Sequence, residues 1–409
     1  MEAMPFLHSF DDHENASTTS KTKVDRRKQL KSVARIVFFV GSMRDNDSVR
    51  STLQTLRSPN RPDVKKPLSF IFETWYIQHT ASTSERYNDN LDNALHNLHW
   101  YSPEIWNERQ QSLVKNALPV PVHSHNDYLQ RIPLWEALGS GCISVEADIH
   151  FKNSNLLVGH NSQGLDKTKT LRAMYLDPLQ KLIALRNKNI NRKGHHWNGI
   201  FDKAPQQSIV LLIDLKTSAE ETFAELNAQL QPLRNLNFLT HWNGTHRVER
   251  PLTIVASGNT LFTSILSLNS SHRDILFDAD ATRLVSQGDD WTDASAPIFK
   301  FNVSNSYYAS TKVADARVRK YDFPEGSEQE RSLMDGSNPQ FVDAMESQLK
   351  QAKVRGLVTR YWDVPTQKNK QESLWRWLMD NEVGVLNMDD MGVVRDRARG
   401  WSNLMSRSN

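Results

Sequence analysis

Residues 144–161, SVEADIHFKNSNLLVGHN, combine a strand-like apolar pattern with two carboxylates and a histidine. Glu146 and Asp148 are two positions apart, so strand alternation directs both side chains to one face. Such neighbours repel each other unless a cation or a proton lies between them. His160 follows in the same stretch, and histidine suits proton transfer near neutral pH. The stretch therefore predicts a cation site or acid–base chemistry.

Two other strand-like segments end in chemically active side chains. IVLLIDLK places Asp214 and Lys216 on one strand face, and VPVHSH ends in His123 and His125. Three carboxylates at one barrel mouth, those of Glu146, Asp148 and Asp214, suit a hard divalent cation such as Mg²⁺. The lysine suits stabilisation of a phosphoryl oxygen. The structural alternative is that the acids pair with nearby Lys or Arg and stabilise the barrel rim.

The elements that must position these residues begin near residue 117. Short β-branched apolar runs, typical of strands, alternate with helical patterns. The predicted strands are 118–124, 142–150, 208–216, 251–257, 274–280, 297–303, 354–362 and 382–390. Eight β units with intervening helices predict an α/β fold, a (β/α)8 TIM barrel, whose strands end at one mouth. A doubly wound open sheet is the alternative, but no glycine-rich phosphate loop follows any strand.

The remaining chain divides by composition. Residues 1–66 are polar and predicted to be mostly disordered. Residues 67–116 contain tryptophans and tyrosines without clear periodicity, and we expect a partly helical extension there. The barrel is predicted over 117–400, followed by a C-terminal tail at 401–409.

Composition narrows the function classes. The 409 residues carry a net charge of only +3, which argues against a nucleic-acid binder. The one cysteine excludes an intrachain disulfide. No apolar run reaches the ~20 residues of a membrane span, and a soluble protein of the cytoplasm or the secretory pathway is expected. ARIVFFVGSM, at 34–43, follows basic residues, so a degenerate signal or anchor stays an alternative.

Taken together, these motifs resemble a known superfamily. HNDY, VEADIHF, LLVGH and LLIDLKTS are similar to motifs of the PLC-like phosphodiesterases, which include glycerophosphodiester phosphodiesterases and sphingomyelinase D type enzymes. The longer stretch 122–161, with TLRAMYLDPL, RYWDVP and GVLNMDD, resembles the fungal altered inheritance of mitochondria protein 6 family within it. The resemblance covers about 117–400, with its sharpest motifs before residue 220.

The resemblance implies a distorted barrel that is a metal-dependent phosphoric diester hydrolase with one Mg²⁺ or Ca²⁺. By residue match, the implied metal ligands are Glu146, Asp148 and Asp214, the implied catalytic histidines are His125 and His160, and the lysine near the phosphate is Lys216. One histidine would attack phosphorus or accept a proton, and the other would protonate the leaving oxygen.

Four further residues have alternative assignments in the resemblance. The interval to Glu146 favours His125 over His123, which is expected deeper in the barrel as a second layer behind the ligands. Asn126 and Asp127 are either positioning or substrate residues or plain turn formers. Trp362 matches an aromatic residue that lines the pocket in the superfamily, and a core or rim tryptophan is the alternative.

Departures from the relatives leave the substrate open. The HRG and PENT signatures of glycerophosphodiester phosphodiesterases are missing, since HND stands where HRG would be. A lysophospholipid, a glycerophosphodiester or another small phosphodiester is expected, with peripheral membrane contact left open. Hydrolysis and cyclic-phosphate formation are both compatible with these residues. A mitochondrial link rests on the family name.

Two other functions fit parts of the sequence. H-x-H after the first strand is also the opening of amidohydrolase and PHP-type metal hydrolases, but the later histidines His241, His246 and His272 follow no strand end. A non-catalytic barrel that binds phosphate or a lipid headgroup is the second alternative.

Overall fold

A computed structural model describes residues 114, 117–189, 197–284, 301–316 and 339–395 of the chain. The predicted N-terminal region, nearly all of the predicted extension, the C-terminal tail and the apolar segment 34–43 lie outside the described residues.

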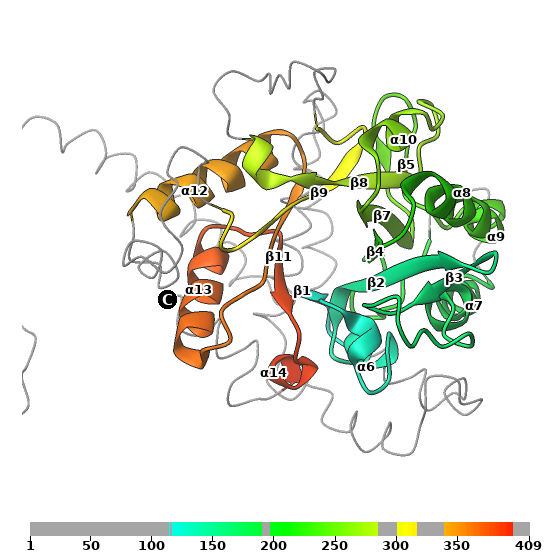
Figure 1. The fold of residues 1–409 in the computed structure, drawn as a ribbon, viewed down its shortest axis with the longest axis horizontal. Coiled ribbons are helices and arrows are strands. Elements are labelled where there is room, and N and C mark those ends of the chain that lie inside the picture. The colour runs from blue at the N-terminus through cyan, green and yellow to red at the C-terminus, as the bar shows by residue number, and fades with distance from the viewer. Residues whose placement is uncertain (1–113, 115–116, 190–196, 285–300, 317–338, 396–409) are drawn as a thin grey trace, which may run out of the picture. The chain divides into compact units, whose positions relative to one another are not determined.

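Eight parallel strands of the described chain close into a barrel. Their ring order is β1, β11, β10, β9, β8, β7, β4 and β2, and β1 pairs with both β11 and β2 (Figure 1). The strands are β1 (Val120–Ser124), β2 (Cys142–Lys152), β4 (Ile209–Leu215), β7 (Leu252–Gly258), β8 (Ile275–Asp280), β9 (Ser306–Lys312), β10 (Val358–Trp362) and β11 (Val385–Met388). The predicted (β/α)8 barrel is confirmed, and the open sheet is excluded by the β1–β2 pairing.

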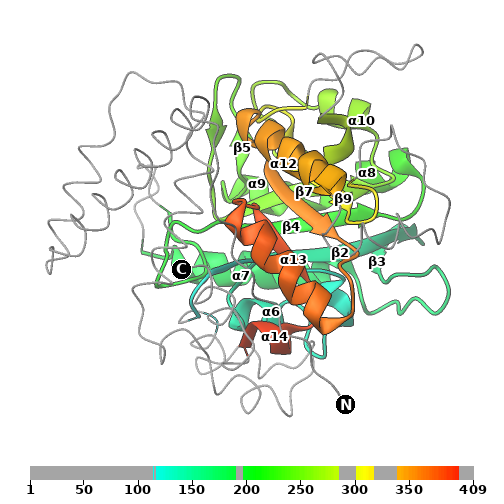
Figure 2. The ribbon, with the colours of Figure 1, turned by 90° about the vertical axis from the view of Figure 1, so that its left-hand side faces the viewer.

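Helices cover the outside of this barrel. Figures 1 and 2 show the longer ones against the strands. The α-helices are α6 (Trp135–Gly139), α7 (Asp177–Arg186), α8 (Ala219–Gln229), α9 (Gln231–Asn235), α10 (Phe262–Leu266), α12 (Pro339–Val354), α13 (Lys368–Asp380) and α14 (Met391–Arg395). Among these described helices, none has both the length and the apolarity needed to cross a bilayer.

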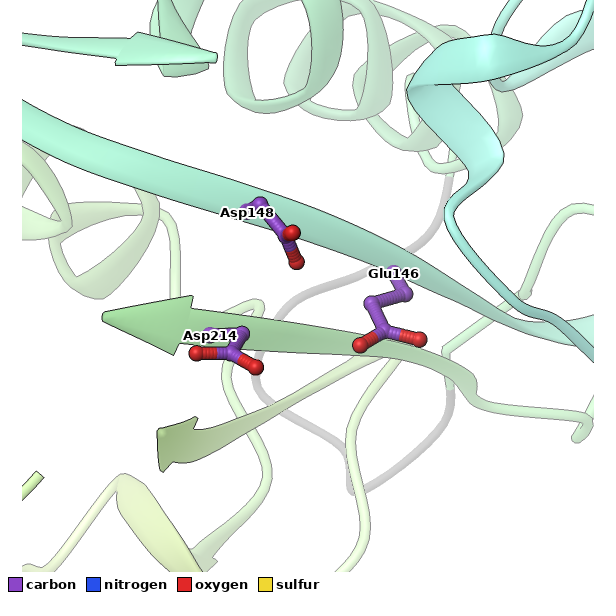
Figure 3. Close-up of side chains that lie close together, drawn as sticks. All are labelled: Glu146, Asp148 and Asp214. Carbon is purple, nitrogen blue, oxygen red and sulfur yellow. The ribbon is translucent and has the colours of Figure 1, made fainter. Parts of the chain in front are cut away.

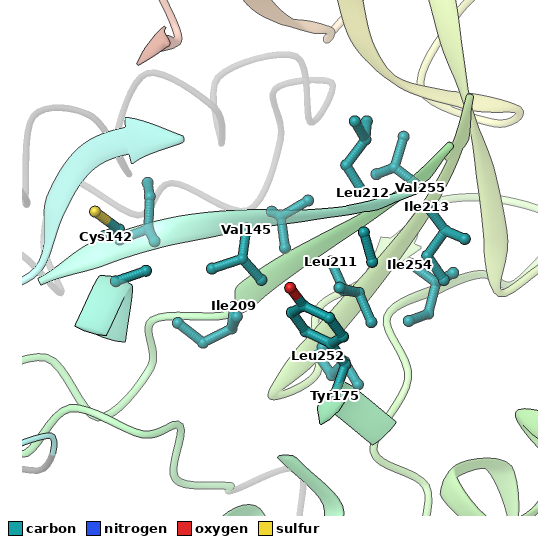
Figure 4. Packing of buried hydrophobic residues seen from close by; sticks show 14 of the residues in the cluster. Cys142, Val145, Tyr175, Ile209, Leu211, Leu212, Ile213, Leu252, Ile254 and Val255 are labelled. Atoms are coloured by element: carbon teal, nitrogen blue, oxygen red, sulfur yellow. The ribbon is translucent and has the colours of Figure 1, made fainter. Parts of the chain in front are cut away.

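The hydrophobic core lies largely between strands and helices. Strand β4, IVLLIDL, is an almost continuous apolar run because it is covered on both faces (Figure 4). Each fully buried Leu or Ile of such a run contributes about 1.5–3 kcal/mol. Cys142, the single cysteine of the chain, is completely buried at the start of β2 and contacts the sulfur of Met391 in α14 at 3.4 Å.

Part of the barrel interior is polar, although the inward positions of β4 and β7 include Leu212 and Val255. Period-two alternation turns Ser144, Glu146 and Asp148 of β2 inward, where Ser144 Oγ accepts a hydrogen bond from Tyr308 of β9 across the barrel at 2.8 Å. Arg360 of β10 also points inward, because its Nη1 lies 3.6 Å from Glu146 Oε2. The inward positions nearest the carboxyl ends therefore form the candidate site.

A short antiparallel strand returns the chain to the site after β2. Asn153 and Ser154 have φ values of 53° and 56°, so they form the tight two-residue turn typical of a hairpin. Strand β3 (Asn155–Val158) then pairs with β2, with Ile149 opposite Val158. Gly159 N donates to Asp148 O at 3.1 Å, which brings the next residue, His160, beside Asp148.

One predicted strand is wrong. Of 297–303, residues 301–303 are not in a strand and 297–300 lie outside the described residues, whereas β9 begins at Ser306. Strand β9, SYYASTK, lacks an apolar run because its inward positions are polar and belong to the barrel interior. Phe301 instead packs against Phe262 and Phe277, with ring centroids 4.9 and 5.8 Å apart.

Candidate active site

Three carboxylates from two adjacent strands converge at the barrel mouth. Glu146 and Asp148 come from β2 and Asp214 from β4, and one oxygen of each lies within 4.8 Å of the others (Figure 3). Asp148 pairs with Asp214 in the parallel register, which sets their side chains next to each other. Oδ1 of Asp148 and Oδ1 of Asp214 are buried and accept no hydrogen bond from the described part of the chain. Burying carboxylate oxygens without partners costs free energy. The three carboxylates together fit one hard divalent cation.

Lys216 holds the other oxygens of the two aspartates. Its Nζ lies 2.9 Å from Asp214 Oδ2 and 3.1 Å from Asp148 Oδ2. Burial raises the pKa of Asp214 to about 6, although Lys216 opposes this effect. The lysine thus neutralises part of the acidic cluster while both Oδ1 atoms stay unpaired.

Gly258, at the end of β7, makes room for the Asp214 carboxylate. Its φ is +65°, and a Cβ there would collide with Asp214 Oδ1 and lie 2.7 Å from Leu215 O. Both the backbone conformation and the close approach therefore require glycine at this position.

Glu146 lies deeper and is ionised. Burial alone would raise its pKa, but hydrogen bonding from His123 and the charge of Arg360 hold the pKa far below its usual range. Arg360 is itself buried and bridges Glu146 and Asp278, with its Nη2 3.3 Å from Asp278 Oδ2. Glu146 is therefore a fixed negative charge in the wall of the site.

His123 is a buried, neutral histidine. Tyr308 donates to Ser144 Oγ, so the Ser144 hydroxyl is free to donate to His123 Nδ1 at 2.7 Å. His123 Nε2 then carries the proton and donates to Glu146 Oε2 at 3.0 Å. Burial lowers the pKa of His123 to about 4, with Arg360 acting in the same direction. This places His123 behind a carboxylate of the triad, as expected for a residue one position deeper than His125.

His125 faces the pocket. Its Nδ1 lies 2.7 Å from Asp389 Oδ1, which follows β11, and its Nε2 lies 3.8 Å from Glu146 Oε2. Burial lowers its pKa, but the carboxylates of Asp389 and Glu146 outweigh this and raise it. With Nδ1–H donated to Asp389, Nε2 is directed at the site and can accept a proton.

His160 lies on the other side of the acidic cluster. The β2–β3 hairpin carries it to Asp148, whose Oδ2 lies 3.0 Å from His160 Nδ1. Its side chain is 57% exposed, which suits proton exchange with a group leaving toward solvent. The Tyr128 hydroxyl is also within hydrogen-bond distance of His160 Nδ1, at 3.2 Å.

Asn126 and Tyr128 connect the two histidines. Asn126 has left-handed backbone geometry, with φ 48°, and its side-chain amide lies 3.3 Å from His125 Nδ1. The Tyr128 hydroxyl lies 2.6 Å from the Asn126 side chain and 2.7 Å from Asp148 Oδ2. A continuous set of polar contacts therefore runs from His125 to His160.

Asp127 and Trp362, the other two candidates, differ in position. Asp127 is buried and accepts hydrogen bonds from Ser124 Oγ, Leu134 N and Tyr175 Oη at 2.6–2.9 Å, so its carboxylate organises the turn after β1. Trp362 lines the pocket, and its ring lies under Lys312 Nζ at 4.9 Å.

A pocket of about 810 Å³ joins these groups at the carboxyl ends of the strands. Seven of its lining residues were candidates from the sequence: His125, Asn126, Glu146, His160, Asp214, Lys216 and Trp362. The sequence motifs gave no role to Tyr128 or Arg360. Strand alternation could have identified Arg360, because it lies two residues before Trp362 and therefore on the same strand face.

Comparisons with known proteins agree with this architecture. Residues 111–278 match the family described as "AIM6-like phosphodiesterase domain". Fold and match together define a (β/α)8-barrel domain of the phosphodiesterase type. No solved structure matches the chain.

Relatives among curated proteins identify the family. The chain is 31% identical over 69% of its length to the altered inheritance of mitochondria protein 6 homolog of Arthroderma benhamiae, covering 85% of that protein. It is 32% identical to altered inheritance of mitochondria protein 6 of Eremothecium gossypii, over 70% of the chain and 72% of that protein. It is 29% identical to altered inheritance of mitochondria protein 6 of Saccharomyces cerevisiae, over 68% of the chain and 71% of that protein. The chain belongs to the altered inheritance of mitochondria protein 6 family, which confirms the resemblance predicted from its motifs.

Proposed function

We propose that this chain is a divalent-cation-dependent phosphoric diester hydrolase that acts on a small or phospholipid-derived phosphodiester. The observation that carries the proposal is the pair of unpaired buried oxygens, Asp148 Oδ1 and Asp214 Oδ1, flanked by two histidines of different exposure. The phosphodiesterase-type domain match supports the reaction class.

The proposed cation ligands are Glu146, Asp148 and Asp214. An all-oxygen carboxylate set suits Mg²⁺ first and Ca²⁺ second, since both prefer hard oxygen ligands. When bound, such a cation would polarise the phosphodiester and offset negative charge that builds up on its oxygens.

Each histidine has a proposed task that follows from its hydrogen bonds. His125 donates Nδ1–H to Asp389, so its Nε2 is the base or nucleophile at the inner side of the pocket. His160 is oriented by Asp148 through Nδ1, so its Nε2 would protonate the leaving oxygen near solvent. Lys216, fixed between two aspartates, would hold a phosphoryl oxygen as negative charge develops.

The rival amidohydrolase or PHP reading receives less support. His123 is engaged on both nitrogens by Ser144 and Glu146. His241, in the short strand β5 (His241–Trp242), and His272, in the loop before β8, contact each other with ring centroids 4.1 Å apart. Metal analysis separates the readings, because two transition ions per chain would favour the rival and one Mg²⁺ or Ca²⁺ the phosphodiesterase.

A phosphodiester panel tests the proposal. Lysophosphatidylcholine, glycerophosphocholine, glycerophosphoinositol and bis-p-nitrophenyl phosphate are incubated with Mg²⁺ and with EDTA. We expect turnover of at least one ester that EDTA abolishes and Mg²⁺ restores, and that His125→Ala or His160→Ala lowers by at least ~100-fold. Turnover that survives EDTA would contradict the mechanism, and ligand binding with no turnover would favour the non-catalytic binder.

A further inference from the structure

The pocket wall that adjoins Asp214 in the acidic triad (Glu146, Asp148 and Asp214) has no assigned role. Strands β7, β8 and β9 and the turn after β8 supply it, with Ser257, Asp278, Asp280, Thr282 and Ser310 among its side chains. Among the described residues that line the pocket, Trp362 is the one large apolar side chain. A wall made of hydroxyls and carboxylates, with Lys312 of β9 also lining the pocket, would leave an acyl chain without apolar partners and suits a polar group.

Asp278 is the residue in this wall whose hydrogen bonding is incomplete. Its side chain is 5% exposed, yet it lines the pocket. Oδ2 accepts from Ser257 Oγ at 3.0 Å and lies 3.3 Å from Arg360 Nη2, and Ser310 is a further hydrogen-bonding neighbour of the carboxylate. No donor among the described residues reaches Oδ1 with full hydrogen-bond geometry. A buried acceptor without a donor indicates a missing partner, and the carboxylate torsion is soft enough to turn Oδ1 toward the pocket.

Arg360 fixes how far this acceptor lies from the reacting centre. Its single guanidinium contacts Glu146 Oε2 through Nη1 and Asp278 Oδ2 through Nη2. The guanidinium of Arg360 therefore lies between Asp278 and Glu146 of the acidic triad. At this separation Asp278 is within reach of the alcohol part of a phosphodiester whose phosphate lies at the triad.

We propose that Asp278 is the headgroup-binding residue of this site and that it selects an alcohol carrying hydrogen-bond donors, a hydroxyl or a primary ammonium. This inference rests on the proposed phosphodiesterase function. A quaternary ammonium such as choline has no N–H or O–H to offer Oδ1, and an apolar alcohol has none either. Acyl chains of a lipid substrate would stay outside the pocket.

Two matched pairs of phosphate monoesters test the selection by calorimetry in the presence of Mg²⁺. Phosphoethanolamine and phosphocholine differ in their N–H donors, and glycerol 3-phosphate and propyl phosphate differ in their hydroxyls. We expect the donor-bearing member of each pair to bind at least ~10-fold more tightly, as for a hydrogen bond to a charged acceptor. Monoester binding needs no turnover, so a failed hydrolysis panel and a failed preference are separate results.

The decisive variant is Asp278→Asn, with Asp280→Asn as its control. Ser257 and Arg360 both donate to one side of residue 278, so the amide oxygen should remain there and the amide NH₂ should face the pocket. We expect the preference to fall to within about 2-fold, with propyl phosphate affinity unchanged. Asp280 Oδ1 already accepts from Thr282 N and Oγ1, so Asp280→Asn should keep the preference.

Several results would overturn the inference. Equal affinity within each pair for the wild type would remove its basis, and so would a preference that survives Asp278→Asn. A uniform loss of affinity for all four monoesters in Asp278→Asn would indicate a structural role for the carboxylate. Absence of binding by every monoester would likewise reject Asp278 as a headgroup residue.

Discussion

Individual side chains of this site are held by partners that fix their protonation and direction. His123 is kept neutral by burial, while His125 is paired with a carboxylate that raises its pKa, although the two histidines are only two positions apart at the end of β1. Environment, not residue type, separates their tasks. Tyr128 and Asp127 differ in a similar way, because Tyr128 contacts residues of the site whereas Asp127 holds the turn after β1.

Tyr128→Phe should impair the reaction more than the fold. Loss of the hydroxyl removes the contacts to Asn126, Asp148 and His160, so we expect ~10- to 100-fold lower kcat, a shifted pH–rate profile and a stability loss of about 1–2 kcal/mol. The matched control is Tyr175→Phe, whose hydroxyl donates to Asp127. It should lose similar stability at normal kcat, and equal effects of both changes on kcat would contradict a positioning role for Tyr128.

Asp127→Asn should change the pH dependence of stability. Burial raises the pKa of Asp127 from 3.8 to about 6, so the folded state binds this proton more tightly than the unfolded state. Ionised Asp127 therefore lowers the free energy of unfolding. This loss is absent below pH 4, grows as the pH rises to 6 and is complete above pH 6, at up to about 3 kcal/mol.

The variant should therefore gain stability relative to wild type between pH 4.5 and 7.5. Urea unfolding at both pH values measures this, and the difference between the proteins isolates residue 127 from other titrating groups. A difference that does not change with pH would show that Asp127 is not the buried acid responsible.

At the scale of elements, strand ends and one hairpin assemble the site. The apolar runs of β2 and β4 were predictable because strands covered on both faces read as continuous hydrophobic segments. Alternation then placed Glu146, Asp148 and Asp214 correctly on the inward face. β9 was missed because its inward residues serve the pocket, and Arg360 and Asp278 were missed because a single sequence does not show which distant strands face each other across a barrel.

Gly258→Ala should disturb both the end of β7 and the proposed cation site. The added methyl would push against Asp214 Oδ1 and strain a backbone with φ +65°. We expect a loss of about 1–3 kcal/mol in unfolding free energy and at least ~10-fold weaker Mg²⁺ binding by calorimetry. Gly164, also at positive φ but with no atoms near its Cβ position, is the control. Wild-type Mg²⁺ affinity in Gly258→Ala would separate Asp214 from the proposed ligands.

For the whole molecule, cation binding should appear as thermal stability. Mg²⁺ at 100 times its Kd should stabilise the wild type by about 2.7 kcal/mol, or roughly 5–10 °C in Tm. Asp214→Asn should abolish this shift. Without cation it should be at least as stable as wild type at pH 7.5, because burial raises the pKa of Asp214 to about 6 and disfavours its ionised form. Thermal scans with Mg²⁺ and with EDTA decide, and an undiminished shift in Asp214→Asn would contradict the site.

The single thiol of the chain, buried beside α14, can serve as a natural probe of local opening in this barrel. A maleimide dye can reach Cys142 only when the seam between β2 and α14 opens, so labelling speed in native buffer reports the frequency of that opening without any engineered probe. Comparing the labelling rate with and without Mg²⁺ would show whether cation binding at the carboxyl ends of the strands also reduces opening around Cys142, at the start of β2.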